Sequence, residues 1–242
     1  MKRQIIGLSD KGVVRPANQD SYFVDDEKKR FCIVADGMGG HAGGEEASRI
    51  ATKTICTHLQ ENWHNSALDS EMLLKGAVNK ANQDILKDQQ QHPERGDMGT
   101  TVVVLIFREG QQWCAHVGDS RLYRFRGGNL EQITDDHTWV GMALKKGEID
   151  AEQAKFHPWR HVLSQCLGRE DLQRIDIQEL DVKSGDRLLV CSDGLTEEVS
   201  DGQIKTILAN QQSSKRAPQE LIDAAKAAGG SDNITIVIVE EE

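Results

Sequence analysis

Four short motifs that each contain an aspartate constrain the architecture of this chain more than any other feature. They are Asp36-Gly37-Met38-Gly39-Gly40, Gly118-Asp119-Ser120, Ser192-Asp193-Gly194 and Ser231-Asp232-Asn233. In the first three motifs the aspartate lies at or next to the end of an apolar, strand-like run, and Asp232 comes just before such a run. Carboxylates at the ends of strands can meet at one edge of a sheet, where they repel one another unless hard cations such as Mg²⁺ or Mn²⁺ bind between them. The motifs therefore predict a metal-dependent enzyme that acts on phosphate.

The order of apolar patterns along the chain predicts an α+β fold in a single domain that covers residues 1–242. Strand-like runs cover residues 4–9, 21–24, 30–35, 101–107, 112–117, 121–125, 175–180, 187–191 and 234–239. Helical spacing of apolar residues covers residues 45–63, 70–91, 203–209 and 218–228, with a shorter pattern at 150–155, and Ser70 is the expected N-cap of the second helix. Strands in runs and helices in pairs are typical of mostly antiparallel sheets with helices packed on their faces, rather than of βαβ units.

The overall charge and the cysteine content limit the expected partners and location. The chain has 39 Asp and Glu against 29 Lys and Arg, for a net charge of −10. Nucleic acid is therefore not an expected partner, because its phosphates require clustered Lys and Arg. No apolar stretch is long enough for a signal peptide or for a membrane span of about 20 residues. The five cysteines are scattered without a Cys-x-x-Cys pair, which is typical of reduced thiols. We therefore expect a cytoplasmic protein with no membrane partner.

The glycine-rich loop after the third strand permits two interpretations. The stretch from Gly37 to Ala42 fits a G-x-G-x-x-A dinucleotide fingerprint. However, Asp36 would place a carboxylate near the pyrophosphate, and the chain continues into a second helix instead of a parallel strand. The metal interpretation accounts for both the aspartate and the glycines, because Asp36 would bridge two cations and the small residues would let the Gly37 carbonyl approach one of them.

A protein nucleophile is not evident in the sequence. None of the five cysteines is followed by five residues and then an arginine, as a cysteine phosphatase requires. Ser192 lacks the G-x-S-x-G elbow of a serine hydrolase, and the chain has no P-loop lysine. A water activated by metal ions is therefore the expected nucleophile.

Further motifs along nearly the whole chain complete the pattern. In order they are Arg15-Pro16-Ala17-Asn18-Gln19-Asp20, Val34-Ala35-Asp36-Gly37-Met38-Gly39-Gly40, Met98-Gly99-Thr100-Thr101, His116-Val117-Gly118-Asp119-Ser120-Arg121, Thr134-Asp135-Asp136-His137, Leu167-Gly168, Cys191-Ser192-Asp193-Gly194-Leu195 and Ser231-Asp232-Asn233-Ile234-Thr235. Together they resemble the bacterial members of the PPM/PP2C family of metal-dependent serine/threonine protein phosphatases.

The resemblance implies an α-β-β-α sandwich with the metal site at one edge of the two sheets, and it implies a ligand set. Asp36 would bridge two core Mn²⁺ or Mg²⁺ ions, and Gly37 would offer its carbonyl to the second ion. Asp193 and Asp232 would complete the shell of the first ion. Asp119, together with Asp193, would hold a third, weaker cation.

The resemblance also implies two further catalytic roles. Asp20 would orient the metal-bound water that attacks phosphorus, and Arg15 would bind the substrate phosphate, which a guanidinium matches in fork geometry. Some family members have a histidine where this chain has Met38, and that histidine is assigned as general acid. Methionine cannot donate a proton, so the leaving group would take its proton from metal-bound water or, as the weaker alternative, with help from His41.

The family also suggests a substrate class and a specificity element. We expect hydrolysis of phosphoserine and phosphothreonine in proteins, in signalling that opposes a bacterial serine/threonine kinase, with type VI secretion as one candidate system. Residues 138–166 match the position of a flap that would contact the substrate protein. Two alternatives stay open, namely a phosphatase of small phosphomonoesters and a non-catalytic domain that binds phosphoproteins.

Several polar residues near the motifs have simpler interpretations. Asp135, Asp136 and His137 are expected to be loop residues outside the site. The eight histidines show no zinc-like spacing, and His116 is expected to be a buried core residue with its hydrogen bonds satisfied.

Overall fold

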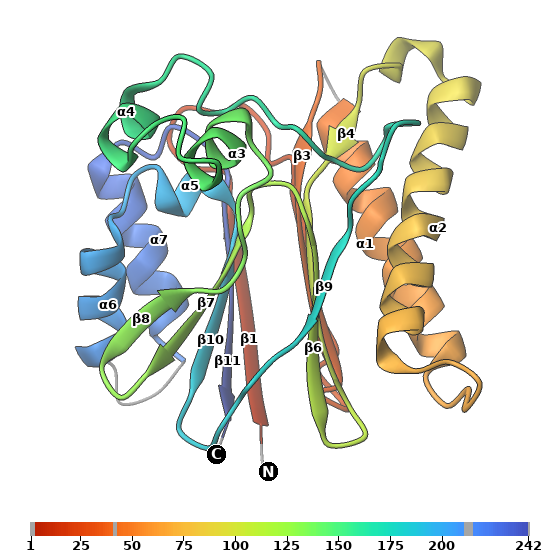
Figure 1. Cartoon of the computed structure of the whole chain (residues 1–242), viewed down its shortest axis with the longest axis horizontal. Coiled ribbons are helices and arrows are strands. Elements are labelled where there is room, and N and C mark those ends of the chain that lie inside the picture. Colours follow the sequence, from red (N-terminus) through yellow and green to blue (C-terminus); the bar gives the residue numbers. More distant parts are fainter. Residues whose placement is uncertain (1–2, 41–42, 211–214, 242) are drawn as a thin grey trace.

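The computed structural model describes residues 3–40, 43–210 and 215–241, whose strands form two antiparallel sheets that face each other (Figure 1). The first sheet has the order β1 (Arg3–Asp10), β11 (Ile234–Glu241), β10 (Arg187–Cys191), β7 (Arg121–Arg126) and β8 (Asn129–Gln132). The second sheet has the order β2 (Asp20–Val24), β3 (Phe31–Met38), β5 (Val102–Arg108), β6 (Gln111–Val117) and β9 (Asp176–Glu179), and the short strand β4 (Gly99–Thr100) pairs with β3.

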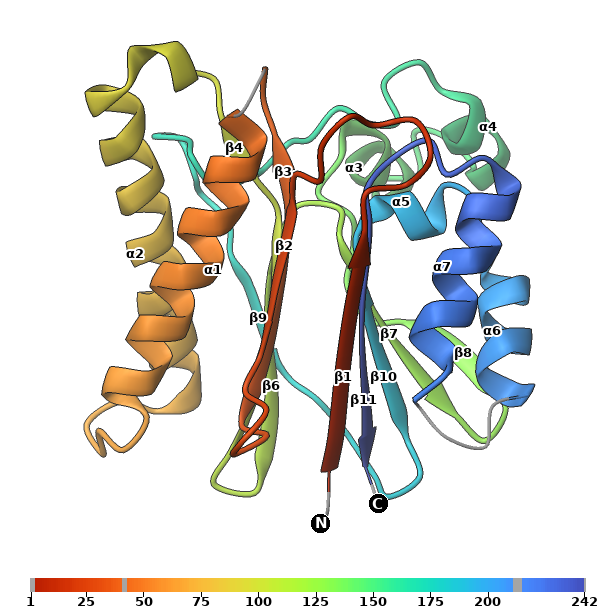
Figure 2. The same ribbon diagram turned by 180° about the vertical axis from the view of Figure 1, so that it is seen from behind.

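Helices cover the outer face of each sheet (Figure 2). Two long helices, α1 (Gly43–Asn62) and α2 (Ser70–Gln91), lie on the second sheet, while α6 (Asp201–Asn210) and α7 (Ala217–Ala228) lie on the first. The shorter elements are a 3₁₀ turn (Pro93–Arg95), α3 (Trp139–Lys145), α4 (Ala151–Phe156) and α5 (Asp193–Thr196). The predicted α-β-β-α sandwich of mostly antiparallel sheets is therefore confirmed.

Strand alternation divides the core into three layers. In β3, Phe31 and Ile33 face α1 and α2, whereas Cys32 and Val34 face the other sheet. A third apolar layer fills the space between the first sheet and the helices α6 and α7. Central strands are thus buried on both faces, which explains why they are continuous apolar runs in the sequence. No helix within the described ranges is both long and apolar enough to cross a bilayer.

The structure corrects one predicted helix cap and adds short elements that the sequence patterns missed. The N-cap of α2 is Asp69, whose carboxylate accepts a hydrogen bond from Met72 N at 2.7 Å, and Ser70 is instead the first, buried helical residue. Strand β8 and helices α3 and α5 were not predicted, because their few residues show no clear apolar pattern of a strand or helix.

The antiparallel order brings the ends of distant strands to one rim of the sandwich. The ends of β3, β6 and β10 and the start of β11 lie at the same rim, on the side opposite to the chain ends (Figures 1 and 2). The helices α3, α4 and α5 lie at this rim as well. The rim is therefore where the aspartate motifs meet.

Candidate active site

The residues predicted from the motifs converge on one cleft at this rim. A cleft of about 800 Å³ is lined by Arg15, Asp36, Gly37, Asp119, Asp193 and Asp232, among others. Asp20 is the one predicted residue that does not line it. It begins β2 and lies opposite Asp36 of β3 in the strand register, behind the cleft. The convergence that the sequence predicted is thus present in the fold.

Hydrogen bonds from neighbouring strands fix the two paired aspartates. The backbone N–H of Asp36 donates to Thr101 Oγ1 at 3.0 Å, and Thr100 Oγ1 donates to the Asp36 carbonyl at 2.8 Å. Ser192 Oγ donates to Asp20 Oδ2 at 2.8 Å. Asp20 Oδ1 is buried and finds no hydrogen-bond partner within the described part of the chain. A buried acceptor without a donor marks a place where a ligand or ordered water belongs.

Strand β3 needs a glycine directly after Asp36 for a steric reason. The Gly37 N–H donates to the Gln19 carbonyl at 3.2 Å, and a Cβ at Gly37 would lie 2.0 Å from the carbonyl oxygen of Gly44 in the first turn of α1. The backbones of β3 and α1 therefore approach too closely at Gly37 for any side chain. Met38 also lines the cleft, and the alternative proton donor His41 lies outside the described residues.

The carboxylates in the cleft strongly perturb one another. Burial raises the pKa of Asp36 well above its usual range, and the charges of Asp20 and Asp193 add to the effect. Burial likewise raises the pKa of Asp20 to about 7. For Asp193 and Asp119 burial again raises the pKa, helped respectively by the charges of Asp232 and Asp193. Cations placed among these groups would reverse the repulsion and stabilise the ionised carboxylates.

Arg15 provides a positive charge directly beside Asp232. Its Nη2 donates to Asp232 Oδ2 at 2.6 Å, and this hydrogen bond raises the pKa of the guanidinium further. Half of the Arg15 side chain remains exposed to the cleft and solvent. The guanidinium therefore lies beside the predicted ligands with donors still available to an anion.

Asn233 connects the Arg15 loop to the aspartate motif of β11, and the sequence analysis gave it no role. Its Oδ1 accepts from Gln19 N at 2.8 Å, and its Nδ2 donates to the carbonyls of Lys11 and Ala17, both at 2.9 Å. Asn233 is buried and directly follows Asp232. One side chain thus fixes both ends of the loop that carries Arg15. Its position next to Asp232 does not reveal these partners, which are distant in the sequence.

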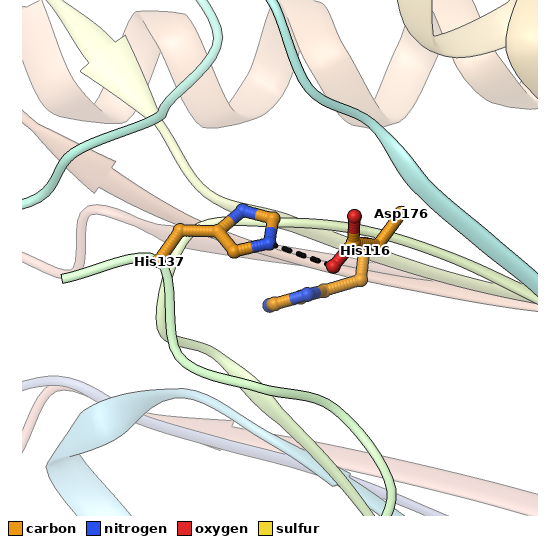
Figure 3. A group of neighbouring side chains, drawn as sticks. All are labelled: His116, His137 and Asp176. Carbon is orange, nitrogen blue, oxygen red and sulfur yellow. Dashed lines mark hydrogen bonds and ion pairs between the residues drawn. The ribbon is translucent and has the colours of Figure 1, made fainter. Parts of the chain in front are cut away.

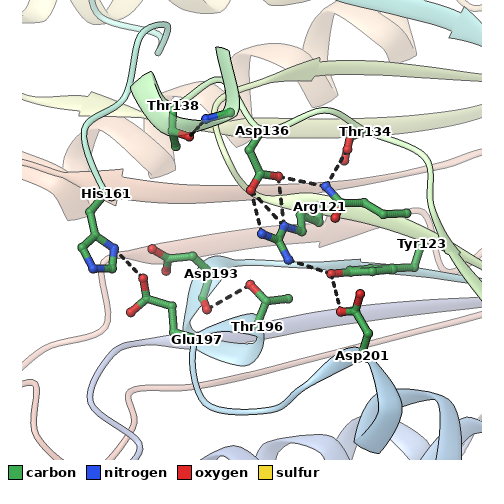
Figure 4. Close-up of polar contacts among 12 residues, drawn as sticks. Arg121, Tyr123, Thr134, Asp136, Thr138, His161, Asp193, Thr196, Glu197 and Asp201 are labelled. Carbon is green, nitrogen blue, oxygen red and sulfur yellow. Dashed lines mark hydrogen bonds and ion pairs between the residues drawn. The ribbon is translucent and has the colours of Figure 1, made fainter. Parts of the chain in front are cut away.

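A second cavity, of about 560 Å³, adjoins the cleft beneath residues 138–166. Both hollows share Asp119, Asp193, His161 and Glu197. His161 Nδ1 lies 2.5 Å from Glu197 Oε1, so the segment contacts the body of the protein beside Asp193 (Figure 4). Burial raises the pKa of Glu197 to about 7. Neither His161 nor Glu197 belongs to a motif, so no sequence pattern indicated this contact.

A fork of hydrogen bonds fixes the strand that follows Asp119. Arg121 donates from Nε and Nη2 to Asp136 at 2.9 and 2.7 Å, and from Nη1 to the Tyr123 hydroxyl at 2.8 Å (Figure 4). The Tyr123 hydroxyl donates in turn to Asp201 at 3.1 Å. Asp136, predicted to be a loop residue outside the site, thus supports the turn that carries Asp119.

His116 differs from its prediction in one respect. It is buried as expected, but neither of its ring nitrogens has a hydrogen-bond partner among the described residues. The strand register places it opposite Asp176 on β9, and His137 packs against its ring with centroids 4.5 Å apart. The fold therefore brings together two histidines and an aspartate that have no zinc-like spacing in the sequence.

The family model for protein phosphatase 2C matches residues 15–233, a span that contains every candidate site residue. The chain belongs to the protein phosphatase 2C family. The serine/threonine phosphatase stp of Listeria innocua is 34% identical over 235 residues, which cover 96% of this chain and 93% of that protein. The predicted PPM/PP2C assignment and its serine/threonine phosphatase class are thereby confirmed.

Solved structures of the protein phosphatase 2C family have the same fold. The catalytic domain of the phosphatase PstP, in complex with two manganese ions, superposes with a TM-score of 0.85 at 33% identity, covering 98% of this chain and 97% of that one. PppA, a key regulatory component of the type VI secretion system in Pseudomonas aeruginosa, superposes with a TM-score of 0.82 at 31% identity, covering 99% and 98%.

Proposed function

We propose that this chain hydrolyses phosphoserine and phosphothreonine in proteins with the help of Mn²⁺ or Mg²⁺. The observation that carries the proposal is the convergence of four aspartates, Asp36, Asp119, Asp193 and Asp232, on one cleft of a protein phosphatase 2C fold. The presence of two manganese ions in the related PstP structure supports the choice of metal.

The residues of the cleft fit divalent cations. The carboxylates are crowded and their pKa values are raised, and Asp20 Oδ1 has no hydrogen-bond partner among the residues that the structure describes, so the donor set suits cations that would neutralise it. We assign two core ions to Asp36, Asp193, Asp232 and the Gly37 carbonyl, and a third, weaker ion to Asp119 together with Asp193. When bound, the cations would lower the pKa of water and neutralise charge on the phosphoryl oxygens.

The protein's own groups would then bind and orient the reactants. The Arg15 guanidinium, beside Asp232 and half exposed, matches the fork geometry of a phosphate dianion, which a lysine does not. Among the described residues, no donor reaches one carboxylate oxygen of Asp20, which lies beside Asp36, and we assign Asp20 the orientation of the attacking water. Met38 has no proton to give to the leaving group, so that proton must come from water or solvent.

We assign residues 138–166 the role of a flap that contacts the substrate protein. The Trp139 ring stacks on His157 at 4.7 Å and meets Trp159 edge-on at 5.2 Å, which gives the segment an internal aromatic cluster. Its outer surface exposes Phe156 and Trp159, at 73% and 54%. Large exposed apolar side chains close to a catalytic cleft are suited to bind a protein partner. Exchange of the segment for that of a relative should change substrate preference, and unchanged preference would refute the assignment.

The partner is proposed to be a bacterial serine/threonine kinase or its phosphorylated targets, in the cytoplasm. The likeness to PppA makes phosphoproteins of a type VI secretion system one candidate set. The acidic charge of −10 supports a protein substrate rather than nucleic acid.

The test compares substrate classes in the presence of Mn²⁺. We expect kcat/KM for a phosphothreonine peptide to exceed that for small phosphomonoesters, because a peptide can also contact the flap. A higher kcat/KM for a small phosphomonoester would favour a metabolite phosphatase. Binding of the phosphopeptide without phosphate release would favour a non-catalytic regulator.

A further inference from the structure

A polar cluster with two buried histidines lies directly behind the turn that carries Asp119, and nothing in the proposed chemistry uses it. The cluster consists of His116 at the end of β6, His137 in the loop before α3, and Asp176 at the start of β9 (Figure 3). Both histidines are buried. Figure 3 shows the His137 ring directed toward the Asp176 carboxylate, with the His116 ring beside it.

His137 is bonded to the Asp119 turn through both its backbone and its ring. Its backbone N–H donates to the Gly118 carbonyl at 2.8 Å, and the Gly118 N–H donates to His137 Nδ1 at 3.2 Å. Gly118 has φ of +109°, and a Cβ there would lie 2.6 Å from the Thr101 side chain. The turn is therefore confined between Thr101 on one side and His137 on the other, and Asp119 follows directly.

The hydrogen bond that Nδ1 accepts determines which ring nitrogen of His137 carries the proton. Nδ1 accepts from a backbone N–H, so the proton of the neutral ring must be on Nε2, which lies 3.1 Å from Asp176 Oδ2. Asp176 is itself held by Arg174, whose Nη2 donates to it at 2.6 Å. A carboxylate at one ring nitrogen favours the tautomer that leaves the other nitrogen free to accept.

The same geometry argues against a metal ion within the cluster, although its ligand atoms lie within 4.8 Å of one another. A cation at His137 Nε2 would require the lone pair of that nitrogen, and the proton would then move to Nδ1. A proton on Nδ1 would point at the Gly118 N–H, so the hydrogen bond between Gly118 and His137 would be lost and two N–H donors would face each other. The cluster is built to orient a hydrogen bond.

We infer that His137 is a positioning residue for the third cation site, acting through the Gly118 N–H on the carboxylate of Asp119, with Asp176 fixing its tautomer. This inference rests on the proposed role of Asp119 as a ligand. A series of hydrogen bonds runs from Arg174 through Asp176 and His137 to the turn at Gly118. Residues that orient a metal ligand typically change metal affinity about 10- to 100-fold when they are replaced.

Two substitutions of His137 separate its two ring contacts. In His137→Asn the amide oxygen can occupy the position of Nδ1 and accept from Gly118, but the contact to Asp176 is lost. In His137→Gln the amide can reach Asp176, but the acceptor for Gly118 is lost. Mn²⁺ binding to the purified chain, followed by electron paramagnetic resonance of the free ion, reports the weakest site without turnover. Asp119→Ala identifies which part of the isotherm belongs to that site.

We expect His137→Gln to weaken the site that Asp119→Ala removes by about 10- to 100-fold, and His137→Asn to bind Mn²⁺ like the wild type. Equal weakening in both variants, accompanied by equal loss of thermal stability, would show a purely structural role and overturn the inference. So would wild-type Mn²⁺ binding by His137→Gln, or an isotherm in which Asp119→Ala removes no site. Phosphate release by the wild type is measured separately, so failure of the proposed activity would be recognised independently of these outcomes.

Discussion

Replacing Asn233 by alanine tests whether one buried amide holds the loop that carries Arg15 in place. Three hydrogen bonds are lost, one from Gln19 N at 2.8 Å and two to the carbonyls of Lys11 and Ala17 at 2.9 Å. At a net value of about 1 kcal/mol each, the free energy of unfolding should fall by about 3 kcal/mol. For a chain of this size that corresponds to a fall in Tm of about 6–12 °C.

The same substitution should weaken substrate binding, because the loop from Lys11 to Gln19 carries Arg15. We expect Asn233→Ala to raise KM for a phosphothreonine peptide while kcat changes less, measured by steady-state phosphate release well below the lowered Tm. A double-mutant cycle with Arg15→Ala provides the control. In the Arg15→Ala background the Asn233 substitution should still lower stability but should raise KM no further. An equal rise of KM in both backgrounds, or unchanged stability, would refute the reasoning.

Two other predictions concern single side chains. Arg15→Ala should raise KM about ten- to a hundredfold with kcat largely retained, since hydrogen bonds to charged groups contribute about 1.5–3 kcal/mol, and Arg15→Lys should recover only part of the loss; an equal collapse of kcat would contradict the assignment. Burial lowers the pKa of His116 to about 3 in the folded protein. In the unfolded chain the same histidine has an ordinary pKa of about 6.5. Between about pH 6.5 and pH 3 the unfolded state therefore binds one more proton than the folded state, and the folded protein loses stability as the pH falls through this window. Between pH 7 and pH 5 the free energy of unfolding should therefore fall in the wild type by about 2 kcal/mol more than in His116→Gln. Parallel pH profiles of stability for the two proteins would contradict this prediction.

The sequence predicted the parts of the fold where apolar patterns are long and regular. Helix α2 has the expected bounds at Ser70 and Gln91, and the core strands β5 and β10 coincide with apolar runs, because their residues face packed layers on both sides. Helix α5 escaped prediction, since it is a single turn that follows β10 directly. The predicted N-cap of α2 was wrong by one residue because serine and aspartate are both favourable N-cap residues. In the structure Asp69 is the N-cap, and Ser70 is buried as the first helical residue.

The candidate site was predicted where residue type alone implies chemistry. Aspartates at strand ends were recognisable because unpaired carboxylates have few other uses, and all of those predicted as ligands line the cleft. Residues that act through hydrogen bonds to the backbone were not recognisable, because Asn233 and His137 acquire their roles only from partners distant in sequence. The unsatisfied nitrogens of His116 likewise depend on packing between β6 and β9.

The central claim is that the aspartates hold the cations that hydrolysis requires. Its most direct test measures phosphate release from a phosphothreonine peptide by the wild type and by Asp36→Asn, each with Mn²⁺ and with excess EDTA. The account predicts release by the wild type only with Mn²⁺, and loss of turnover in Asp36→Asn with the fold retained by circular dichroism. Release that persists in EDTA, or wild-type turnover by Asp36→Asn, would contradict it.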